Sequence, residues 1–403
     1  MSSKVIVCIA GKNQIAIDGV RSVLNAGILK SEIYSICNKT DTGKDCWQPS
    51  FKRYCRLNNI KIVELEDVYE IESLVFISLE FDQIVSTLKF KSKKLFNIHF
   101  SALPKYKGMF TSILPILHGE ENSGVTLHYI NDGIDTGDVI DQILFSLPEY
   151  ITGVNLYFKY LKFGKELLEK NIQNIIRTKI KSVPQNISKS SYFSKSFIDF
   201  NNLEINFRQS AFQVTNYINA FSFRPYQLLS LNGSQVVKCV CTNNQSYLKP
   251  GTIIFENPLY FEVSTIDFNI RVLKDNLDEI LNKAKLNDKK AIEEFYNLGF
   301  DLNDRNEKGW NSLIVASFYE SIDVIEFLLE NNKVDINCFN YNGTTPLMYA
   351  MTTSIKNSNL KIMKRLIDLG ANPYQEDFSG KNVFEYAEEY GNREIINFLI
   401  TYQ

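Results

Sequence analysis

The chain has only three histidines, and one of them lies where a ligand could reach it. His99 follows the run Lys94–Phe96, so it falls at the C-terminal end of a predicted strand. In open α/β sheets, ligands bind at that edge. Asn97 lies two residues earlier, so its side chain leaves the strand on the same face as His99. An imidazole titrates near neutral pH, and the pair therefore predicts proton-transfer chemistry at this edge, whereas His118 and His128 lie in no motif and are interpreted as structural.

The elements around this pair alternate between short apolar runs and helical stretches as far as about residue 150. Strands are expected at Lys4–Ala10, Ile33–Cys37, Leu74–Leu79, Leu95–Phe100, Val125–Ile130 and Val139–Phe145. Helices are expected at Ile15–Ala26, Phe81–Leu88 and Val154–Arg177. A turn rich in Asp and Gly, residues 132–138, lies between the last two strands. The alternation is typical of βαβ units, so it predicts a Rossmann-like α/β domain with a mostly parallel sheet.

The region after this domain has a different pattern. One helix is expected at Phe207–Phe221, followed by short strands at Leu228–Leu231, Val236–Cys241 and Leu259–Val263. We interpret this segment as a small α+β appendage.

The last 130 residues repeat themselves. Gly309, Gly343 and Gly380 start similar segments, and their spacings of 34 and 37 residues are close to the ankyrin period. The second copy keeps Gly-x-Thr-Pro-Leu, and an earlier, weaker copy covers about residues 277–306. We therefore expect a C-terminal all-α ankyrin solenoid of about four repeats. The predicted domains are 1–184, 185–274 and 275–403.

Composition narrows the classes of function. The net charge is −2, with 44 Lys plus Arg against 46 Asp plus Glu, which argues against a general nucleic-acid binder. No apolar run approaches the ~18 residues that span a bilayer. The seven cysteines form no CxxC pair, so we expect reduced thiols and no metal site.

The motifs together resemble those of a known enzyme family. Asn-x-His-x-Ser-x-Leu-Pro-x-Tyr-x-Gly at 97–108 and Asp-Gly-Ile-Asp-Thr-Gly at 132–137 are similar to the formyltransferases that use 10-formyltetrahydrofolate. Segments 11–16 and 106–112 most resemble the dTDP-amino-sugar N-formyltransferases. Some of these, acting on dTDP-3-amino-3,6-dideoxyglucose, carry C-terminal ankyrin repeats. The resemblance covers about residues 1–270.

The resemblance implies a reaction and its catalytic residues. A formyl group would pass from 10-formyltetrahydrofolate, as co-substrate, to the primary amine of a dTDP-linked amino-dideoxy-sugar, foremost dTDP-3-amino-3,6-dideoxy-D-glucose. The attack creates an oxyanion and requires the amine to shed a proton. The family's residues carry over onto Asn97 as oxyanion donor, His99 as base and proton donor to the leaving folate nitrogen, and Asp135 as the residue that orients His99. No metal is implied.

The resemblance also implies ligand contacts. The folate is expected at Phe76, Ser78, Leu79, Asp132 and Ile134, although Asp132 is equally well explained as a turn residue. The nucleotide-sugar is expected at Lys12, Asn13, Phe81, Tyr106, Met109, Phe110, Thr111, Arg224 and Tyr226. An aromatic residue of the segment 221–227 can stack on thymine, and Arg224 can pair with the diphosphate. For Phe221 and Phe223, a place in a small core is the competing interpretation.

One residue of the repeats suggests a second ligand. Trp310 occupies a position that normally points outward, and an exposed Trp is costly unless something covers it. Together with Arg305, Tyr319, Tyr341 and Tyr349 it predicts a second, regulatory nucleotide-sugar site. A surface for a protein partner or for self-association, and a purely structural appendage, are the alternatives.

Two other functions compete with this hypothesis. A methionyl-tRNA formyltransferase-like enzyme would need a basic surface, which the charge balance does not favour. An ankyrin interaction module on an inactive scaffold would not need the intact Asn-His-Asp set. We expect binding of neither nucleic acid nor membrane, a cytoplasmic location, a homodimer as in related enzymes, and a role in bacterial surface polysaccharide such as the O-antigen of lipopolysaccharide.

Overall fold

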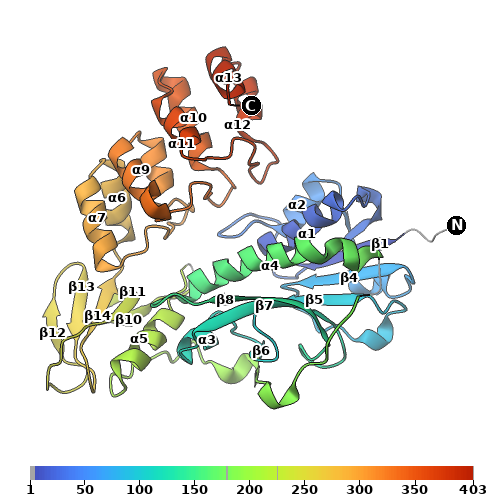
Figure 1. Cartoon of the computed structure of the whole chain (residues 1–403), viewed down its shortest axis with the longest axis horizontal. Coiled ribbons are helices and arrows are strands. Elements are labelled where there is room, and N and C mark those ends of the chain that lie inside the picture. The colour runs from blue at the N-terminus through green and yellow to red at the C-terminus, as the bar shows by residue number, and fades with distance from the viewer. Residues whose placement is uncertain (1–4, 178–179, 225, 403) are drawn as a thin grey trace. The chain divides into compact units, whose positions relative to one another are not determined.

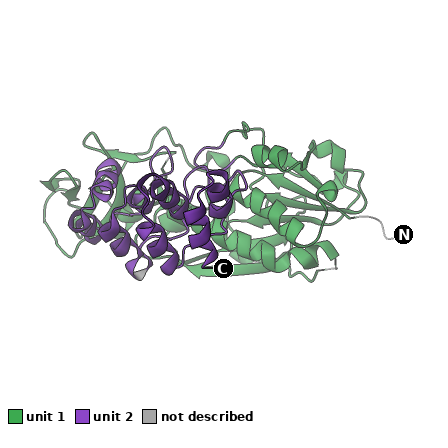
Figure 2. Cartoon of the chain, turned by 90° about the horizontal axis from the view of Figure 1, so that it is seen from above, with its two compact units in different colours: residues 1–44, 50–274 green, residues 45–49, 275–403 purple. Residues whose placement is uncertain are grey.

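The computed structural model describes residues 5–177, 180–224 and 226–402. The chain divides into two compact units, one of residues 1–44 and 50–274 and the other of residues 45–49 and 275–403 (Figure 2). Among the described residues, no helix is long and apolar enough to cross a membrane. The seven cysteines are all free.

A seven-stranded sheet forms the centre of the first unit, in the order β3-β2-β1-β4-β5-β7-β8 (Figure 1). Its parallel strands are β1 (Ile6–Gly11), β2 (Ile33–Cys37), β3 (Lys61–Ile62), β4 (Leu74–Leu79) and β5 (Leu95–His99). The antiparallel strands β7 (Asn122–Tyr129) and β8 (Val139–Ser146) complete it. The expected α/β fold with a mostly parallel sheet is therefore confirmed.

Four helices accompany this sheet: α1 (Asn13–Asn25), α2 (Phe51–Leu57), α3 (Leu114–Leu117) and α4 (Gly153–Arg177). In α4, apolar residues recur every three or four positions and are buried, for example Leu156, Tyr160 and Leu167. Gly164 lets α4 approach the sheet, because a Cβ there would lie 3.2 Å from the Phe100 ring. The long helix therefore packs through a stripe set by its own sequence period.

The prediction of a helix at Phe81–Leu88 is wrong. This segment is a loop with a single 3₁₀ turn at Thr87–Lys89, and its apolar residues Ile84 and Leu88 are 81% and 83% exposed. Asp132 Oδ1 accepts hydrogen bonds from the Thr87 hydroxyl at 2.7 Å and the Thr87 N–H at 3.2 Å. The apolar spacing is helical, but tertiary hydrogen bonds fix a different backbone.

A smaller antiparallel sheet follows in the first unit. Its strands are β10 (Leu229–Leu231), β11 (Ser234–Cys241), β14 (Ile270–Lys274), β13 (Tyr260–Val263) and β12 (Ile253–Glu256), in that order. Helix α5 (Ala211–Ala220) is tied to β11 by the Asn219 side chain, which bonds both the N–H and the C=O of Cys239. Strands β6 (Lys107–Gly108) and β9 (Tyr192–Phe193) form a separate parallel pair.

The second unit is a series of short helices. They are α6 (Leu277–Lys285), α7 (Lys289–Leu298), α8 (Ser312–Phe318), α9 (Ile322–Leu329), α10 (Pro346–Asn357), α11 (Lys361–Asp368), α12 (Val383–Glu389) and α13 (Arg393–Ile400). One turn recurs between the pairs: Oδ1 of Asn306, Asn340 and Asp377 each accepts from the N–H groups two and four residues later. The expected all-α repeat region is confirmed.

Candidate active site

His99 is the last residue of β5, and both of its ring nitrogens face oxygen atoms. Nε2 lies 2.8 Å from the backbone carbonyl oxygen of Tyr106, and Nδ1 lies 3.5 Å from Oδ2 of Asp135. A carbonyl can only accept, so Nε2 carries a hydrogen in this contact. The contacts therefore suit an imidazolium that donates from both nitrogens.

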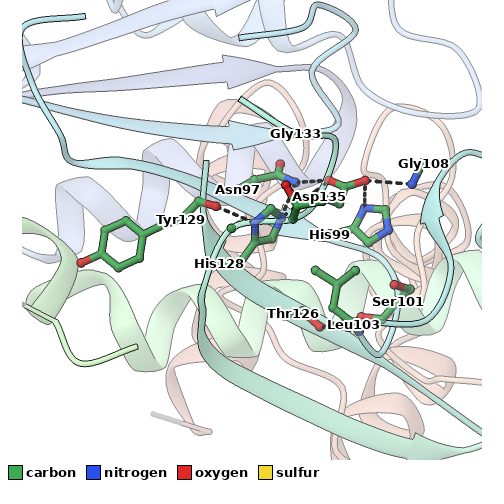
Figure 3. Close-up of polar contacts among 12 residues, drawn as sticks. Asn97, His99, Ser101, Leu103, Gly108, Thr126, His128, Tyr129, Gly133 and Asp135 are labelled. Atoms are coloured by element: carbon green, nitrogen blue, oxygen red, sulfur yellow. Dashed lines mark hydrogen bonds and ion pairs between the residues drawn. The ribbon is translucent and has the colours of Figure 1, made fainter. Parts of the chain in front are cut away.

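Asp135 is the centre of this cluster. Its Oδ2 accepts from the Gly108 N–H at 2.9 Å and faces His99, while its Oδ1 accepts from Asn97 Nδ2 at 3.3 Å and lies 3.6 Å from His128 Nε2 (Figure 3). The carboxylate is only 13% exposed. Each oxygen thus meets groups from two different segments, and the side chain has little freedom to rotate.

Electrostatics keep Asp135 ionised. Burial by itself raises the pKa of this carboxyl, but the two histidines and the Gly108 N–H favour the charged form more strongly. The net effect lowers the pKa well below its ordinary value. A permanent negative charge therefore lies beside His99.

His128 joins the cluster, contrary to its interpretation as a structural residue outside any motif. Its Nδ1 lies 2.8 Å from the Tyr129 carbonyl oxygen and must donate there, so in the neutral ring Nε2 can accept from Asn97 Nδ2 at 3.1 Å. The pairing of β5 with β7 explains the contact, because Asn97 and His128 are directly opposite each other. The local sequence does not specify the strand register that brings His128 to the site.

The turn that carries Asp135 is held by hydrogen bonds to its backbone. Gln185 Nε2 donates to the carbonyl oxygens of Asp135 and Gly137 at 2.8 and 2.7 Å. Gly137 cannot be replaced without a shift, since a Cβ there would lie 1.7 Å from the Tyr129 carbonyl oxygen. Asp135 itself has a φ of +53°, a conformation that costs of order 1 kcal/mol in a non-glycine residue. The fold therefore holds this carboxylate in a strained position.

Strand β6 supplies backbone groups to both catalytic candidates. One of its edges pairs with β9, with Lys107 N–H donating to the Ser191 carbonyl. The opposite edge presents the Tyr106 carbonyl to His99 and the Gly108 N–H to Asp135. The Tyr106 side chain anchors this segment, because its hydroxyl donates to Glu120 at 2.8 Å and lies 3.1 Å from His118 Nδ1.

The residues expected at the folate differ in what they could offer a ligand. Phe76 and Leu79 are fully buried, and the Phe76 ring packs edge-on against Phe81 and Phe90. Ser78 lies opposite Asn97 in the sheet, and Ile134 is 42% exposed. The Asp132 carboxylate is engaged by Thr87. Backbone groups at the end of β4 and the exposed Ile134 side chain therefore fit a flat ring better than the other side chains do.

The residues expected at the nucleotide-sugar lie on several elements of the first unit. Asn13, at the start of α1, donates to Glu80 Oε2 at 3.1 Å, and Lys12 precedes it. Met109 is exposed, and the Phe110 ring lies 5.6 Å from that of Phe200. The Thr111 carbonyl accepts from the Tyr160 hydroxyl at 3.0 Å.

The segment 221–227 separates into buried and accessible residues. Phe221 and Phe223 are buried in the core. Tyr226 is 62% exposed with its ring against Phe223, and Arg224 is partly buried. Only Tyr226 therefore has a ring open to stacking in this segment, apart from residue 225, which lies outside the described residues.

In the second unit, Trp310 is partly covered by its own chain. Its ring lies 5.1 Å from that of Tyr349 and 5.6 Å from that of Phe318. Lys308 Nζ lies 6.0 Å from the Trp310 ring, and Tyr319, 43% exposed, packs edge-on against Phe318. Arg305 instead lies over Phe339, and Tyr341 packs against Gly309. Trp310, Tyr319 and Tyr349 thus belong to one aromatic cluster.

The chain is similar to proteins of two kinds, one for each of its units. A family model described as formyl transferase matches residues 64–172, and ankyrin repeat models match residues 280–354 and 342–378. The crystal structure of an N-formyltransferase from Helicobacter canadensis, in complex with folinic acid and dTDP-3-aminofucose, is 46% identical. It covers 67% of this chain and 100% of its own, with a TM-score of 0.64.

Two further relatives are similar to the first unit. A sugar 3N-formyl transferase, solved in the presence of dTDP and 5-N-formyl-THF, is 46% identical over 68% of this chain and 99% of its own, with a TM-score of 0.64. The methionyl-tRNA formyltransferase of Ureaplasma parvum is 29% identical over 62% of this chain and 83% of its own length.

Proposed function

The chain belongs to the formyl transferase family, and from that premise we propose that it transfers the formyl group of 10-formyltetrahydrofolate to the primary amine of a dTDP-linked amino-dideoxy-sugar. The favoured acceptor is dTDP-3-amino-3,6-dideoxy-D-glucose. One observation carries the proposal: a relative with 46% identity, covered over its whole length, was solved with folinic acid and dTDP-3-aminofucose. The cluster of Asn97, His99 and Asp135 supplies the chemistry that such a transfer needs.

In this proposal His99 takes the proton that the attacking amine loses. For His99 to act as a base, its neutral ring keeps the Nδ1 hydrogen on Asp135, and Nε2 gives up its hydrogen bond to the Tyr106 carbonyl so that it can accept a proton. The imidazolium that results donates from Nε2 to the Tyr106 carbonyl and from Nδ1 to Asp135. The charged form is therefore stabilised at both nitrogens, and the same proton is then available to the folate nitrogen when its bond to the formyl carbon breaks.

Asn97 is the proposed donor to the oxyanion that forms from the formyl oxygen. Both N–H groups of its amide are engaged in this structure, since Nδ2 lies 3.1 Å from His128 Nε2 and 3.3 Å from Asp135 Oδ1. To donate to the oxyanion, Asn97 must give up one of these two hydrogen bonds. The bond to Asp135 is the longer, so we expect it to be the one that breaks. Asp135 would keep its contacts with His99 and Gly108 when this happens.

His128 is proposed as a positioning residue that holds the Asn97 amide. His128→Leu removes the acceptor at Nε2, and we expect kcat to fall about 10- to 100-fold because the amide is no longer aimed. His128→Gln offers an amide oxygen in a similar place and is expected to restore most of the rate. Steady-state kinetics on both variants decide: equal loss in the two would mean that His128 serves packing alone.

The remaining contacts follow the family resemblance. The folate is proposed to bind at Ser78, Leu79, Asp132 and Ile134, mostly through backbone groups, with Asp132 acting through the Thr87 loop. The nucleotide-sugar is proposed to contact Lys12, Asn13, Met109, Phe110, Arg224 and Tyr226. Such a reaction belongs in the cytoplasm, in the synthesis of bacterial surface polysaccharide, and the proposal includes a homodimer.

The aromatic cluster of the repeats is proposed as a second, regulatory nucleotide-sugar site built on Trp310, Tyr319 and Tyr349, where a base could stack. Trp310→Ala is expected to abolish this site. Calorimetric titration with dTDP-sugar should give two sites per chain in the wild type and one in the variant. One site in both proteins would refute the idea and leave a protein partner or a structural role.

A formyl-transfer assay tests the proposed function. The protein is mixed with 10-formyltetrahydrofolate and a panel of dTDP-amino-sugars with the amine at C3 or C4, and the products are weighed by mass spectrometry. We expect formylation of a C3 amine. Formylation of methionyl-tRNA instead would favour the alternative suggested by the Ureaplasma parvum relative. No product with any acceptor would favour an inactive scaffold that carries an ankyrin module.

A further inference from the structure

Glu80 carries a carboxylate that the mechanism above does not use. Glu80 follows Leu79 of β4, and His99 follows Ile98 of β5, and Leu79 and Ile98 are paired in the parallel ladder. Glu80 and His99 therefore occupy neighbouring positions at the edge of the sheet where a ligand is expected.

The backbone at this edge is held in an unusual conformation. Glu80 has a φ of +56° and Asn13, the first residue of α1, a φ of +61°. Left-handed conformations are unfavourable for a glutamate, and such residues gather at ligand sites. Asn38 Nδ2 donates to the Glu80 carbonyl at 2.8 Å and holds this conformation in place.

The Glu80 side chain is fixed by two hydrogen-bond donors. Asn13 Nδ2 donates to Oε2 at 3.1 Å, and the Tyr157 hydroxyl lies 3.1 and 3.0 Å from Oε1 and Oε2. A carboxylate can accept about four hydrogen bonds, so it keeps capacity for a further donor. Burial raises the pKa of Glu80, while the nearby Lys12 cation and the two donors partly offset this effect. A second cation at the carboxylate would compensate its burial further.

Tyr157 connects this carboxylate with the segment assigned to the nucleotide. Its ring lies 5.7 Å from that of Phe223, which in turn lies 5.3 Å from that of exposed Tyr226. On its other side, the Tyr157 ring lies 6.2 Å from that of Phe100, the residue after His99. The tyrosine that holds Glu80 thus packs against the residue after the proposed base and against the segment of the proposed nucleotide contact, so the sugar is expected near this carboxylate.

We propose that Glu80 binds the amino group of the acceptor sugar, and that Asn13 and Tyr157 are positioning residues for its carboxylate. This inference rests on the proposed function. A sugar amine is largely protonated near neutral pH, and an acceptor-only group attracts that ammonium and then orients the neutral amine once a proton has left. Glu80 would therefore distinguish an amino-sugar from its hydroxyl counterpart, while His99 performs the proton transfer.

Glu80→Gln tests the proposal, because it keeps the size of the side chain and removes its charge. We expect the KM for the dTDP-amino-sugar to rise at least tenfold, with the KM for the folate changed less than twofold. The wild type should bind the dTDP-amino-sugar at least tenfold more tightly than the dTDP-sugar with a hydroxyl in place of the amine. The variant should lose this preference. Exposed Glu66→Gln, on the turn Leu65–Val68, is the matched control and should behave as the wild type does.

Two results would overturn the inference. The first is an active Glu80→Gln enzyme with an unchanged KM for the amino-sugar, and the second is an undiminished preference for the amine. If circular dichroism shows that Glu80→Gln does not fold, Glu80→Asp takes its place, because the shorter side chain keeps the charge but moves it away from the sugar amine. An unchanged KM for the amino-sugar in Glu80→Asp also refutes the proposal. Failure of the proposed function is distinct, since the wild type would then formylate no dTDP-amino-sugar.

Discussion

Replacement of His99 by asparagine is expected to lower the kcat of formyl transfer about 10³-fold. Asparagine keeps a polar side chain at the end of β5 but has no group that titrates near neutral pH. The amine proton would then have no acceptor, and the leaving folate nitrogen no donor. Steady-state kinetics, with product detected by mass spectrometry, measure the effect, and binding of folate and dTDP-sugar should change little.

The thermal midpoint of the same variant serves as its control. His99 is buried at the edge of the sheet, so a misfolded variant would also lose activity. A His99→Asn protein that melts as the wild type does and keeps more than about a tenth of its kcat would contradict the role of His99 as base.

Asp135→Asn should reduce kcat by about 10²- to 10⁴-fold. The two carboxylate oxygens now accept hydrogen bonds from the Gly108 N–H and the Asn97 amide and lie beside His99 and His128. Asparagine has one oxygen, so its amide nitrogen would face one of these donors, and the charge that stabilises His99 would be lost. Kinetics of the variant measure the loss, and a kcat within about fivefold of the wild type would show that His99 needs no partner.

The same variant has a signature in the pH dependence of stability. The pKa of Asp135 is lower in the folded state than its ordinary value, so its ionised form stabilises the fold at neutral pH. That stabilisation is complete above about pH 4 and is lost as the pH falls through the lowered value. Urea unfolding should therefore show that the gap between wild type and variant narrows as the pH falls below about 4. A gap independent of pH would contradict the assigned ionisation.

The candidate site could be predicted from the sequence only where spacing along one element decides the geometry. Asn97 and His99 were found because alternate residues of a strand share a face. The assignment of Asp135 to the site required the family resemblance, because no local pattern in its turn indicates which strand it faces. His128 was overlooked because its contact with Asn97 depends on the antiparallel register of β5 and β7, which no local pattern specifies.

The fold shows the same division. Strands β2 and β4 have the bounds expected from their apolar runs, and the ankyrin glycines mark the real turns. The helix predicted for residues 81–88 rests on the helical spacing of Ile84 and Leu88, whereas hydrogen bonds from Thr87 to Asp132, 45 residues away, decide the backbone. Glu80 was not among the expected site residues for a related reason, because its partners come from α1, from the residue after β2 and from α4.

The number of residues in and just before strand β6 matters for the proposed catalysis, because main-chain atoms of this segment contact both catalytic candidates. This segment presents the Tyr106 carbonyl to His99 and the Gly108 N–H to Asp135, and among substitutions only proline at position 108 would remove one of these groups. Carbonyl and N–H groups change edges at every residue of a strand. Insertion or deletion of one residue between Pro104 and Met109 is therefore expected to move both atoms away from His99 and Asp135. A change in the number of residues in this segment is therefore expected to disturb the site more than a change of its side chains.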